Sequence, residues 1–337
     1  MRLLLLLGVL LSASAAAHRA SPSYENVTLP TGVTLSTLVA GNASAAAPVI
    51  LFLHGFPAGS WMWSSVVADA ALASFRLVAP DLRGYNRSSA PVGVANYALP
   101  LLAADVAALI GAVAPGGRVH LAAHDWGGAI AWWVAAARPE LLLSLSIVDM
   151  AHPLGWISAV RSDAAQQAAS AYVLSFVNPA FTAFAEAGDF ALLKSIYASE
   201  PFWPSVEPAF ESSWSVAGTV DAALNYYRAN VRPHCPLSCV TAACWLQGVD
   251  SAFDDIPNGG YTPAALRVLV QFGMRDSAFD VPAQLAFIAT KVRGALSVVR
   301  FPNATHWLPQ EQPAAVAANI AAFVGGAQLQ LQQSESP

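Results

Sequence analysis

Short apolar runs alternate with longer helix-like segments over the first 150 residues. Residues 27–38 alternate between polar and apolar positions, which predicts a leading β-hairpin. Strands are predicted at residues 48–53, 75–79, 118–123 and 141–149, and helices at residues 61–71, 101–113 and 129–137. Strands that alternate with helices indicate an α/β fold, with a mostly parallel central sheet flanked by helices.

The pattern changes between residues 151 and 262, where the chain is rich in Ala, Pro and aromatic residues and shows helical fragments without clear strands. Strand and helix patterns return at residues 266–272, 283–291, 296–301 and 314–324. We therefore expect a helical cap at 151–262, inserted between sheet strands that belong to core parts 18–150 and 263–326. The Gln-rich tail at 327–337 is expected to be disordered.

The N-terminal segment 1–17 has a charged start, an apolar stretch and a small-residue end, which together predict a signal peptide cleaved after Ala15 or Ala17. Its apolar stretch is short for a membrane span, so an uncleaved anchor is the less favoured alternative. No later continuous apolar run reaches spanning length. We expect a protein of the secretory pathway, secreted or lumenal, with no stable membrane span.

Composition narrows the possible partners. Only 11% of the residues are charged and 55% are hydrophobic, which excludes an extended disordered protein. The net charge of −5 offers no basic surface for nucleic acid. The oligomeric state stays open. Four Asn-x-Ser/Thr sequons predict a glycoprotein in a eukaryotic lumen: Asn26, Asn42, Asn86 and Asn303.

The three cysteines, Cys235, Cys239 and Cys244, lie within ten residues. An oxidising compartment would allow two of them to form a disulfide bond, and the sequence leaves open which two. A metal site with His234 as fourth ligand is the alternative. We discount it because Cys-x3-Cys-x4-Cys lacks the paired spacing of structural zinc sites, and no metal is expected.

The candidate chemistry starts with His-Asp-Trp-Gly-Gly at residues 124–128, between a predicted strand and a predicted helix. A strand, a sharp turn and a helix form a nucleophile elbow, which requires small residues two positions on either side of the nucleophile, here Ala123 and Gly127. Asp125 stands at the nucleophile position. A carboxylate that attacks a saturated carbon forms an ester that water can cleave, so Asp125 indicates epoxide opening or halide displacement. The alternative, a simple helix N-cap, is less favoured by this context.

Further candidate residues follow the ends of other predicted strands, where active sites of open α/β sheets lie. His-Gly-Phe-Pro at residues 54–57 follows one strand, and by position the backbone N–H groups of Phe56 and Trp126 form an oxyanion hole. Asp276 and His306 follow two later strands, in the chain order expected for such a fold. His306 would activate water, and Asp276 would orient its imidazole. Asp280 competes with Asp276, but it precedes a Pro and is typical of a helix N-cap.

Together with Asp-Leu-Arg-Gly-Tyr at 81–85 and Asn-Tyr-Tyr-Arg at 225–228, these motifs resemble the epoxide hydrolases of the α/β-hydrolase superfamily over residues 48–324. The resemblance implies two cap tyrosines that protonate the epoxide oxygen, Tyr227 and Tyr172. Either could instead be a core aromatic residue, as could Tyr226. Substrate contacts are expected from His54, Pro57, Trp126 and Phe176.

The sequence departs from the family pattern at Asn86, which replaces a Gly, at Thr305, and in an insertion at 233–261 that carries the cysteines. The expected reaction converts an epoxide to a vicinal diol through a hydroxyalkyl ester of Asp125, without metal or organic cofactor. An apolar substrate is expected because the cap is rich in aromatic residues, and Phe176, Phe202, Trp203 and Trp214 are the candidates to line its cavity. A haloalkane dehalogenase and a non-catalytic secreted binding protein are the alternatives. Phe56 and Tyr227 disfavour the dehalogenase, and a complete set of catalytic residues disfavours the binding protein.

Overall fold

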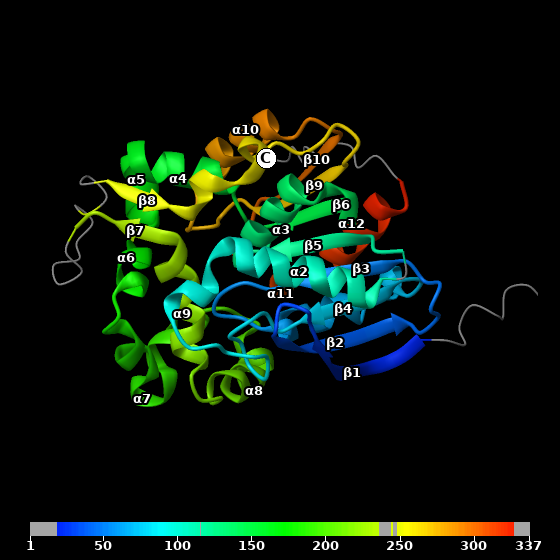
Figure 1. The fold of residues 1–337 in the computed structure, drawn as a ribbon, viewed down its shortest axis with the longest axis horizontal. Helices are drawn as coiled ribbons and strands as arrows, with labels where there is room; N and C mark the ends of the chain where they lie inside the picture. Colours follow the sequence, from blue (N-terminus) through cyan, green and yellow to red (C-terminus); the bar gives the residue numbers. More distant parts are fainter. Residues whose placement is uncertain (1–18, 115, 236–243, 245–247, 327–337) are drawn as a thin grey trace, which may run out of the picture.

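The apolar runs of the sequence form the strands of one eight-stranded sheet, in the order β1-β2-β4-β3-β5-β6-β9-β10. The computed structural model describes residues 19–114, 116–235, 244 and 248–326 (Figure 1). β2 is antiparallel to both of its neighbours, and the remaining pairs are parallel. The strands are β1 Arg19–Thr28, β2 Thr34–Asn42, β3 Val49–Leu53, β4 Arg76–Pro80, β5 Val119–His124, β6 Leu142–Val148, β9 Val268–Gly273 and β10 Leu296–Phe301.

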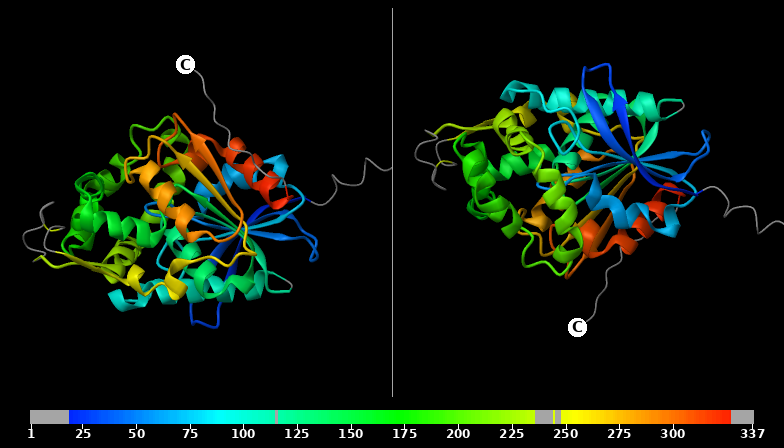
Figure 2. Two further views of the ribbon diagram at one scale, coloured as in Figure 1. Left: turned by 90° about the horizontal axis from the view of Figure 1, so that it is seen from above. Right: turned by 90° about the horizontal axis from the view of Figure 1, so that it is seen from below.

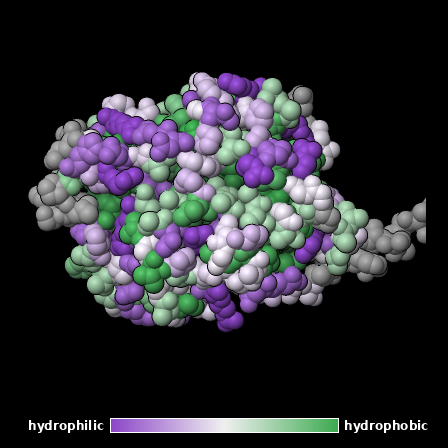
Figure 3. Space-filling view, viewed as in Figure 1, coloured by the Kyte–Doolittle hydropathy of each residue, from purple (hydrophilic) through white to green (hydrophobic). Residues whose placement is uncertain are grey.

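Helices cover both faces of the sheet, which is why every residue of β3 is buried. α2 and α3 pack together on one face, and α1 packs with α12 on the other (Figure 2). On the face drawn in Figure 3, hydrophobic residues are scattered among hydrophilic ones. The core helices are α1 Ser64–Val67, α2 Leu99–Val113, α3 Trp126–Ala137, α10 Val281–Lys291, α11 Leu308–Glu311 and α12 Pro313–Val324.

The helix predicted at 61–71 is wrong in detail. The segment forms a 3-10 turn at Ser60–Trp63 (η1), the short α1, and a second 3-10 turn at Ala70–Leu72 (η2). The Asp69 side chain accepts a hydrogen bond from the Ala71 N–H and so starts the second turn. The leading hairpin is longer than predicted, because β1 and β2 extend beyond residues 27–38 on both sides.

The chain leaves the sheet after β6 and returns at the adjacent strand β9, so the segment between them is an insertion that does not interrupt the sheet. It forms a layer of helices beside the sheet (Figure 1). These helices are α4 Pro153–Ser162, α5 Ala164–Ala169, α6 Ala171–Val177, α7 Phe181–Ser195, α8 Trp203–Trp214 and α9 Thr219–Asn230.

The expectation of no strands in this segment was wrong. β7 Val231–Pro233 pairs with β8 Val249–Ser251 in a small antiparallel sheet, whose strands are too short to show alternation. Two further 3-10 turns, η7 Ala252–Asp255 and η8 Pro257–Gly260, lead back towards β9.

Polar contacts fix the cap to the core. The Asn230 side chain accepts a hydrogen bond from the Leu99 N–H and donates to the Tyr97 carbonyl. The Trp214 indole donates to the carbonyl of Pro57, at the loop after β3, over 3.0 Å. Within the cap, Arg228 of the Asn-Tyr-Tyr-Arg motif pairs with Asp221 at 2.7 Å. The cap is therefore anchored beside the predicted catalytic loops.

The structure pairs Cys235 with Cys244, and Cys239 lies outside the described residues. His234, the rejected fourth metal ligand, pairs with Asp250 at 3.0 Å. Within the described parts of the chain, no group of three or more His, Cys, Asp or Glu residues is placed to hold a metal ion.

The predicted signal peptide and the whole predicted tail lie outside the described residues. In the portion that is described, no helix is both long and apolar enough to cross a membrane. Among the sequons, Asn26 and Asn303 are exposed. Asn86 has a left-handed backbone (φ 47°), as its replacement of a Gly implied, and its side-chain amide donates to Asp81 at 2.9 Å.

Candidate active site

Asp125 lies in the sharp turn between β5 and α3, with φ 49° and ψ −124°. The turn brings the start of α3 against the preceding strand: a Cβ on Gly127 would lie 2.6 Å from the carbonyl oxygens of Leu53 and His54. The Asp125 side chain makes no capping bond to α3. Its Oδ1 accepts the backbone N–H of Phe56 at 2.7 Å instead. The geometry is that of an elbow that presents a carboxylate, and the N-cap alternative is wrong.

The loop after β3 is fixed by His54. The ring Nδ1–H of His54 donates to the Gly55 carbonyl, and Nε2 accepts the Leu82 N–H, each at 2.9 Å. Burial lowers the pKa of His54 to about 4, so the ring is neutral, as these two bonds require. The expectation that His54 contacts substrate was wrong, because both nitrogens are occupied and the residue is fully buried. It positions the loop that carries Phe56.

His306 connects two carboxylates. Its Nδ1 hydrogen-bonds Asp276 Oδ2 at 2.7 Å, and its Nε2 lies 3.7 Å from Asp125 Oδ2. Asp280 is turned away and caps α10 by accepting the Ala283 N–H at 3.2 Å. The structure therefore brings Asp125, His306 and Asp276 together and separates Asp280 from them.

The charges of this group are strongly coupled. Burial alone would lower the pKa of His306, but the negative charge of Asp276 and hydrogen bonds with Asp125 and Asp276 raise it well above its usual value. Burial alone would raise the pKa of Asp125, yet the hydrogen bond and charge of His306 bring it below its usual value. Asp125 is thus ionised and faces a protonated imidazole in the free protein.

Two supports of this group were not predicted. His124 donates from Nε2 to the His306 carbonyl at 2.8 Å. Asp149, at the end of β6, accepts the Gly273 N–H at 2.7 Å and the Leu308 N–H at 3.1 Å. Asp149 therefore joins the loops that carry Asp276 and His306. Burial, and then the charge of Asp276, raise the pKa of Asp149 well above its usual value.

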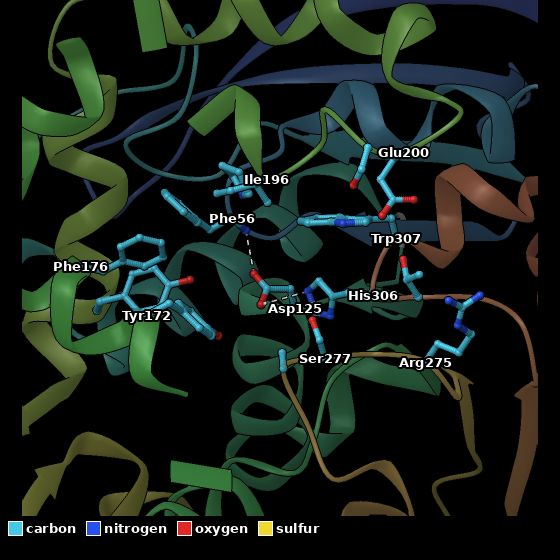
Figure 4. A pocket seen from close by; sticks show the side chains of 15 residues that line it. Phe56, Asp125, Tyr172, Phe176, Ile196, Glu200, Arg275, Ser277, His306 and Trp307 are labelled. Atoms are coloured by element: carbon cyan, nitrogen blue, oxygen red, sulfur yellow. Dashed lines mark hydrogen bonds and ion pairs between the residues drawn. The ribbon is translucent and has the colours of Figure 1, made fainter. Parts of the chain in front are cut away.

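Tyr227, on α9, and Tyr172, on α6, line the same cavity as Asp125, and their ring centroids are 6.5 Å apart. Burial, and then the charge of Asp125, raise the pKa of both phenols, so both stay protonated. Tyr172 is 38% exposed as a residue, but its pKa follows the buried surroundings of the hydroxyl. In Figure 4, Tyr172 lies on one side of Asp125 and His306 on the other. Tyr226 donates to the Arg83 carbonyl at 2.7 Å and is a core residue.

The cavity has a volume of about 430 Å³. Pro57 and Phe176 line it as predicted, whereas Phe202, Trp203 and Trp214 do not, contrary to expectation. Phe202 and Trp203 contact the ring of Tyr197, and Trp214 contacts the rings of Phe56 and Phe210. The complete lining is Phe56, Pro57, Asp125, Tyr172, Phe176, Ile196, Ser199, Glu200, Tyr227, Arg275, Ser277, Ala278, Thr305, His306 and Trp307.

The cavity is not uniformly apolar. Aromatic rings surround Asp125, whereas Glu200, Arg275 and Ser277 form a polar side that the sequence did not predict (Figure 4). Burial, together with the charge of Glu311, raises the pKa of Glu200, and Arg275 acts in the opposite direction. Arg275 and Ser277 flank Asp276, so their position beside a catalytic loop was the signal available in the sequence.

A second, much smaller cavity of about 30 Å³ also reaches Asp125, Tyr172 and Tyr227. Trp126, predicted to contact substrate, lines this cavity and not the large one. The backbone N–H of Trp126 is the first of α3 and follows Asp125 directly, as an oxyanion-hole donor must.

The α/β hydrolase fold family matches residues 48–313, and the chain belongs to this family. An AB hydrolase superfamily protein of Bacillus subtilis is 32% identical over 203 residues, which cover 59% of this chain and 70% of that protein. Epoxide hydrolase 4 of Mus musculus is 28% identical over 288 residues, covering 82% of this chain and 73% of that protein. The crystal structure of an epoxide hydrolase from Bacillus megaterium with an inhibitor superposes with a TM-score of 0.74 at 27% identity, covering 89% of this chain and all of that one. The predicted fold class is confirmed.

Proposed function

We propose that this protein is an epoxide hydrolase that converts an apolar epoxide to a vicinal diol through a hydroxyalkyl ester of Asp125. The observation that carries the proposal is the surroundings of the Asp125 carboxylate. One oxygen accepts the Phe56 N–H, the other faces His306, and two protonated tyrosines line the same cavity. The similarity to named epoxide hydrolases supports the same activity.

In the first step, Asp125 Oδ2 attacks one epoxide carbon, and the bond from that carbon to the ring oxygen breaks. Oδ1 stays hydrogen-bonded to Phe56 and becomes the ester carbonyl oxygen. Tyr227 or Tyr172 donates a proton to the departing ring oxygen, because a phenol with a raised pKa is protonated at neutral pH.

Before the second step, the protonated His306 loses its Nε2 proton, which balances the proton that the tyrosine gave to the substrate. Water then attacks the ester carbonyl carbon and gives one proton to Nε2 of the neutral His306. The oxyanion that develops on Oδ1 is stabilised by the N–H groups of Phe56 and Trp126; one such donor contributes about 3–4 kcal/mol. The intermediate then expels the diol, which carries the former Oδ2. The remaining proton transfers restore the tyrosine and the free carboxylate, so the sum is epoxide plus water to diol.

The two alternative functions are less well supported. A haloalkane dehalogenase needs N–H donors around a halide, whereas the phenols of Tyr172 and Tyr227 suit an oxygen that must be protonated. A non-catalytic binding protein would not need His306 to be oriented by Asp276 at 2.7 Å beside a carboxylate.

A single turnover in oxygen-18 water tests the proposal, with enzyme in excess over epoxide. We expect unlabelled diol and one labelled oxygen in the Asp125 carboxylate, read by peptide mass spectrometry, because water attacks the ester carbon and not the substrate. Labelled diol in the first turnover would exclude the ester. Turnover of 1-haloalkanes without any turnover of epoxides would identify a dehalogenase.

We also propose that the chain enters the secretory pathway, which is supported by the 1–17 pattern and by the Cys235–Cys244 disulfide bond. Expression of the full chain in eukaryotic cells tests this. We expect a secreted or lumenal product that begins near residue 16 or 18 and loses mass on glycosidase treatment. An intact N-terminus on a cytosolic product would contradict it.

A further inference from the structure

The two cavities beside Asp125 differ greatly in size. The large one has a volume of about 430 Å³ and the small one about 30 Å³. Asp125, Tyr172 and Tyr227 belong to both linings, so the cavities meet at the atoms that would touch an epoxide. We call them the large arm and the small arm.

Packed apolar side chains line the small arm. They are Met150, Trp156, Val173, Phe253 and Phe279, and each is at most 8% exposed. Phe253 contacts the rings of Trp126 and Trp156 at 5.9 and 5.7 Å between centroids. By the same measure the small arm has less than a tenth of the volume of the large arm, so it offers far less room for a substituent.

The position of the reacting groups fixes how an epoxide must lie. Asp125 attacks one ring carbon while a tyrosine protonates the ring oxygen, so the ring sits where the arms meet. The bonds from the two ring carbons to their substituents diverge. With the ring at this place, one substituent is directed into the large arm and the other towards the small arm.

Resting on the epoxide hydrolase activity proposed above, we propose that the substrate is a terminal epoxide, or one whose second ring carbon carries at most a methyl group. Its single large substituent lies in the large arm, where it runs from the aromatic rings around Asp125 towards Glu200, Arg275 and Ser277. The small arm thus acts as the determinant of specificity.

Three isomers of one formula test this without a change in hydrophobicity: 1,2-epoxyoctane, cis-2,3-epoxyoctane and cis-4,5-epoxyoctane. Forcing extra carbons into a packed site costs about 1–3 kcal/mol, so kcat/KM for the 4,5-isomer should fall roughly 5- to 150-fold below that for the 1,2-isomer. The 2,3-isomer should resemble the 1,2-isomer. Comparable kcat/KM values for all three isomers would overturn the inference and leave the proposed function intact. Failure of all three isomers to react or to form an ester would instead count against the proposed function.

Substitutions at Met150 test whether the small arm determines the selectivity between isomers. Met150→Ala enlarges the small arm, and the milder Met150→Val is a second choice if the first does not fold. We expect either variant to raise the ratio of kcat/KM for the 4,5-isomer to that for the 1,2-isomer. Met62→Ala, the same truncation at a buried residue that lines neither arm, is the matched control and should leave this ratio unchanged. An equal rise in the Met62 variant, or no rise in a folded Met150 variant, would show that the small arm does not set the selectivity.

Discussion

Replacing Asp276 by Asn tests the assignment of the acid that orients His306. The substitution removes the charge on Asp276 that faces His306 Nδ1 at 2.7 Å and keeps the shape of the side chain. A hydrogen bond to a charged group contributes about 1.5–3 kcal/mol, which corresponds to roughly 10- to 150-fold in rate. The Asn amide can also donate to Nδ1, which places the ring proton on Nε2, the atom that must accept a proton from water. A histidine base held in the wrong tautomer lowers the rate by about 10⁴-fold, so the rate of ester hydrolysis should fall by up to this factor.

The loss should fall on one step only. Ester formation needs ionised Asp125 and a protonated tyrosine, whereas ester hydrolysis needs His306 as a base. Rapid mixing of Asp276→Asn with excess epoxide, followed by acid quenching and mass spectrometry, should therefore reveal an adduct heavier by one substrate that decays very slowly.

Asp280→Asn is the matched control, because Asp280 lies four residues away and caps α10. Asn is an equally good cap, so this variant should hydrolyse the ester at the wild-type rate. Asp276 does not orient His306 if the two variants release diol from the ester equally fast, or if Asp276→Asn turns over normally.

Three further substitutions test other parts of the structure. Gly55→Ala should lower kcat/KM by about 10²-fold or more in a steady-state assay, because its Cβ would collide with the Asp125 carboxylate; unchanged activity would contradict the described loop. Tyr227→Phe should slow ester formation by roughly 10²-fold or more in rapid-quench experiments while the preformed ester hydrolyses normally, and an effect on hydrolysis alone would remove Tyr227 from its assigned role. Replacing both Cys235 and Cys244 by Ser should lower the free energy of unfolding by about 2–3 kcal/mol in denaturant titrations, and an unchanged midpoint would show that the bond does not stabilise the fold.

Most core elements could be predicted because burial on both faces leaves continuous apolar runs, as in β3. Two predictions of elements failed, for different physical reasons. Asp69 interrupts the helix expected at 61–71 because its side chain bonds the Ala71 N–H. β7 and β8 were missed because three residues carry no periodic signal.

In the site, Asp125, Asp276 and His306 were predicted from their places after strand ends, since parallel strands deliver such residues to one edge of the sheet. The cavity wall was not predictable in this way. Ile196, Ser199 and Glu200 come from the insertion. The path of the insertion over the core depends on long-range contacts, such as the hydrogen bond from the Trp214 indole to the Pro57 carbonyl.

Residues that act through others were also missed. The same short motif contains His54 and Phe56, yet only three-dimensional contacts show that one positions the other. Asp149 follows a strand end as Asp276 does, but its two backbone partners lie in distant loops. Closeness in sequence to a catalytic motif therefore indicated which segments form the site, but not which residues act only by positioning others.

The two proposed steps require opposite protonation states of His306. The loss of the Asp125 charge when the ester forms accounts for the change between them. In the free protein, Asp276 and Asp125 together raise the pKa of His306, so the protonated imidazole pairs with the carboxylate that is to attack. Formation of the ester removes the Asp125 charge and leaves Asp276 as the only carboxylate paired with the ring. The pKa of His306 must then fall, which favours loss of the Nε2 proton at the stage when a base is needed. The imidazole therefore becomes a base because the preceding step has occurred, and Asp276 holds its orientation through both steps.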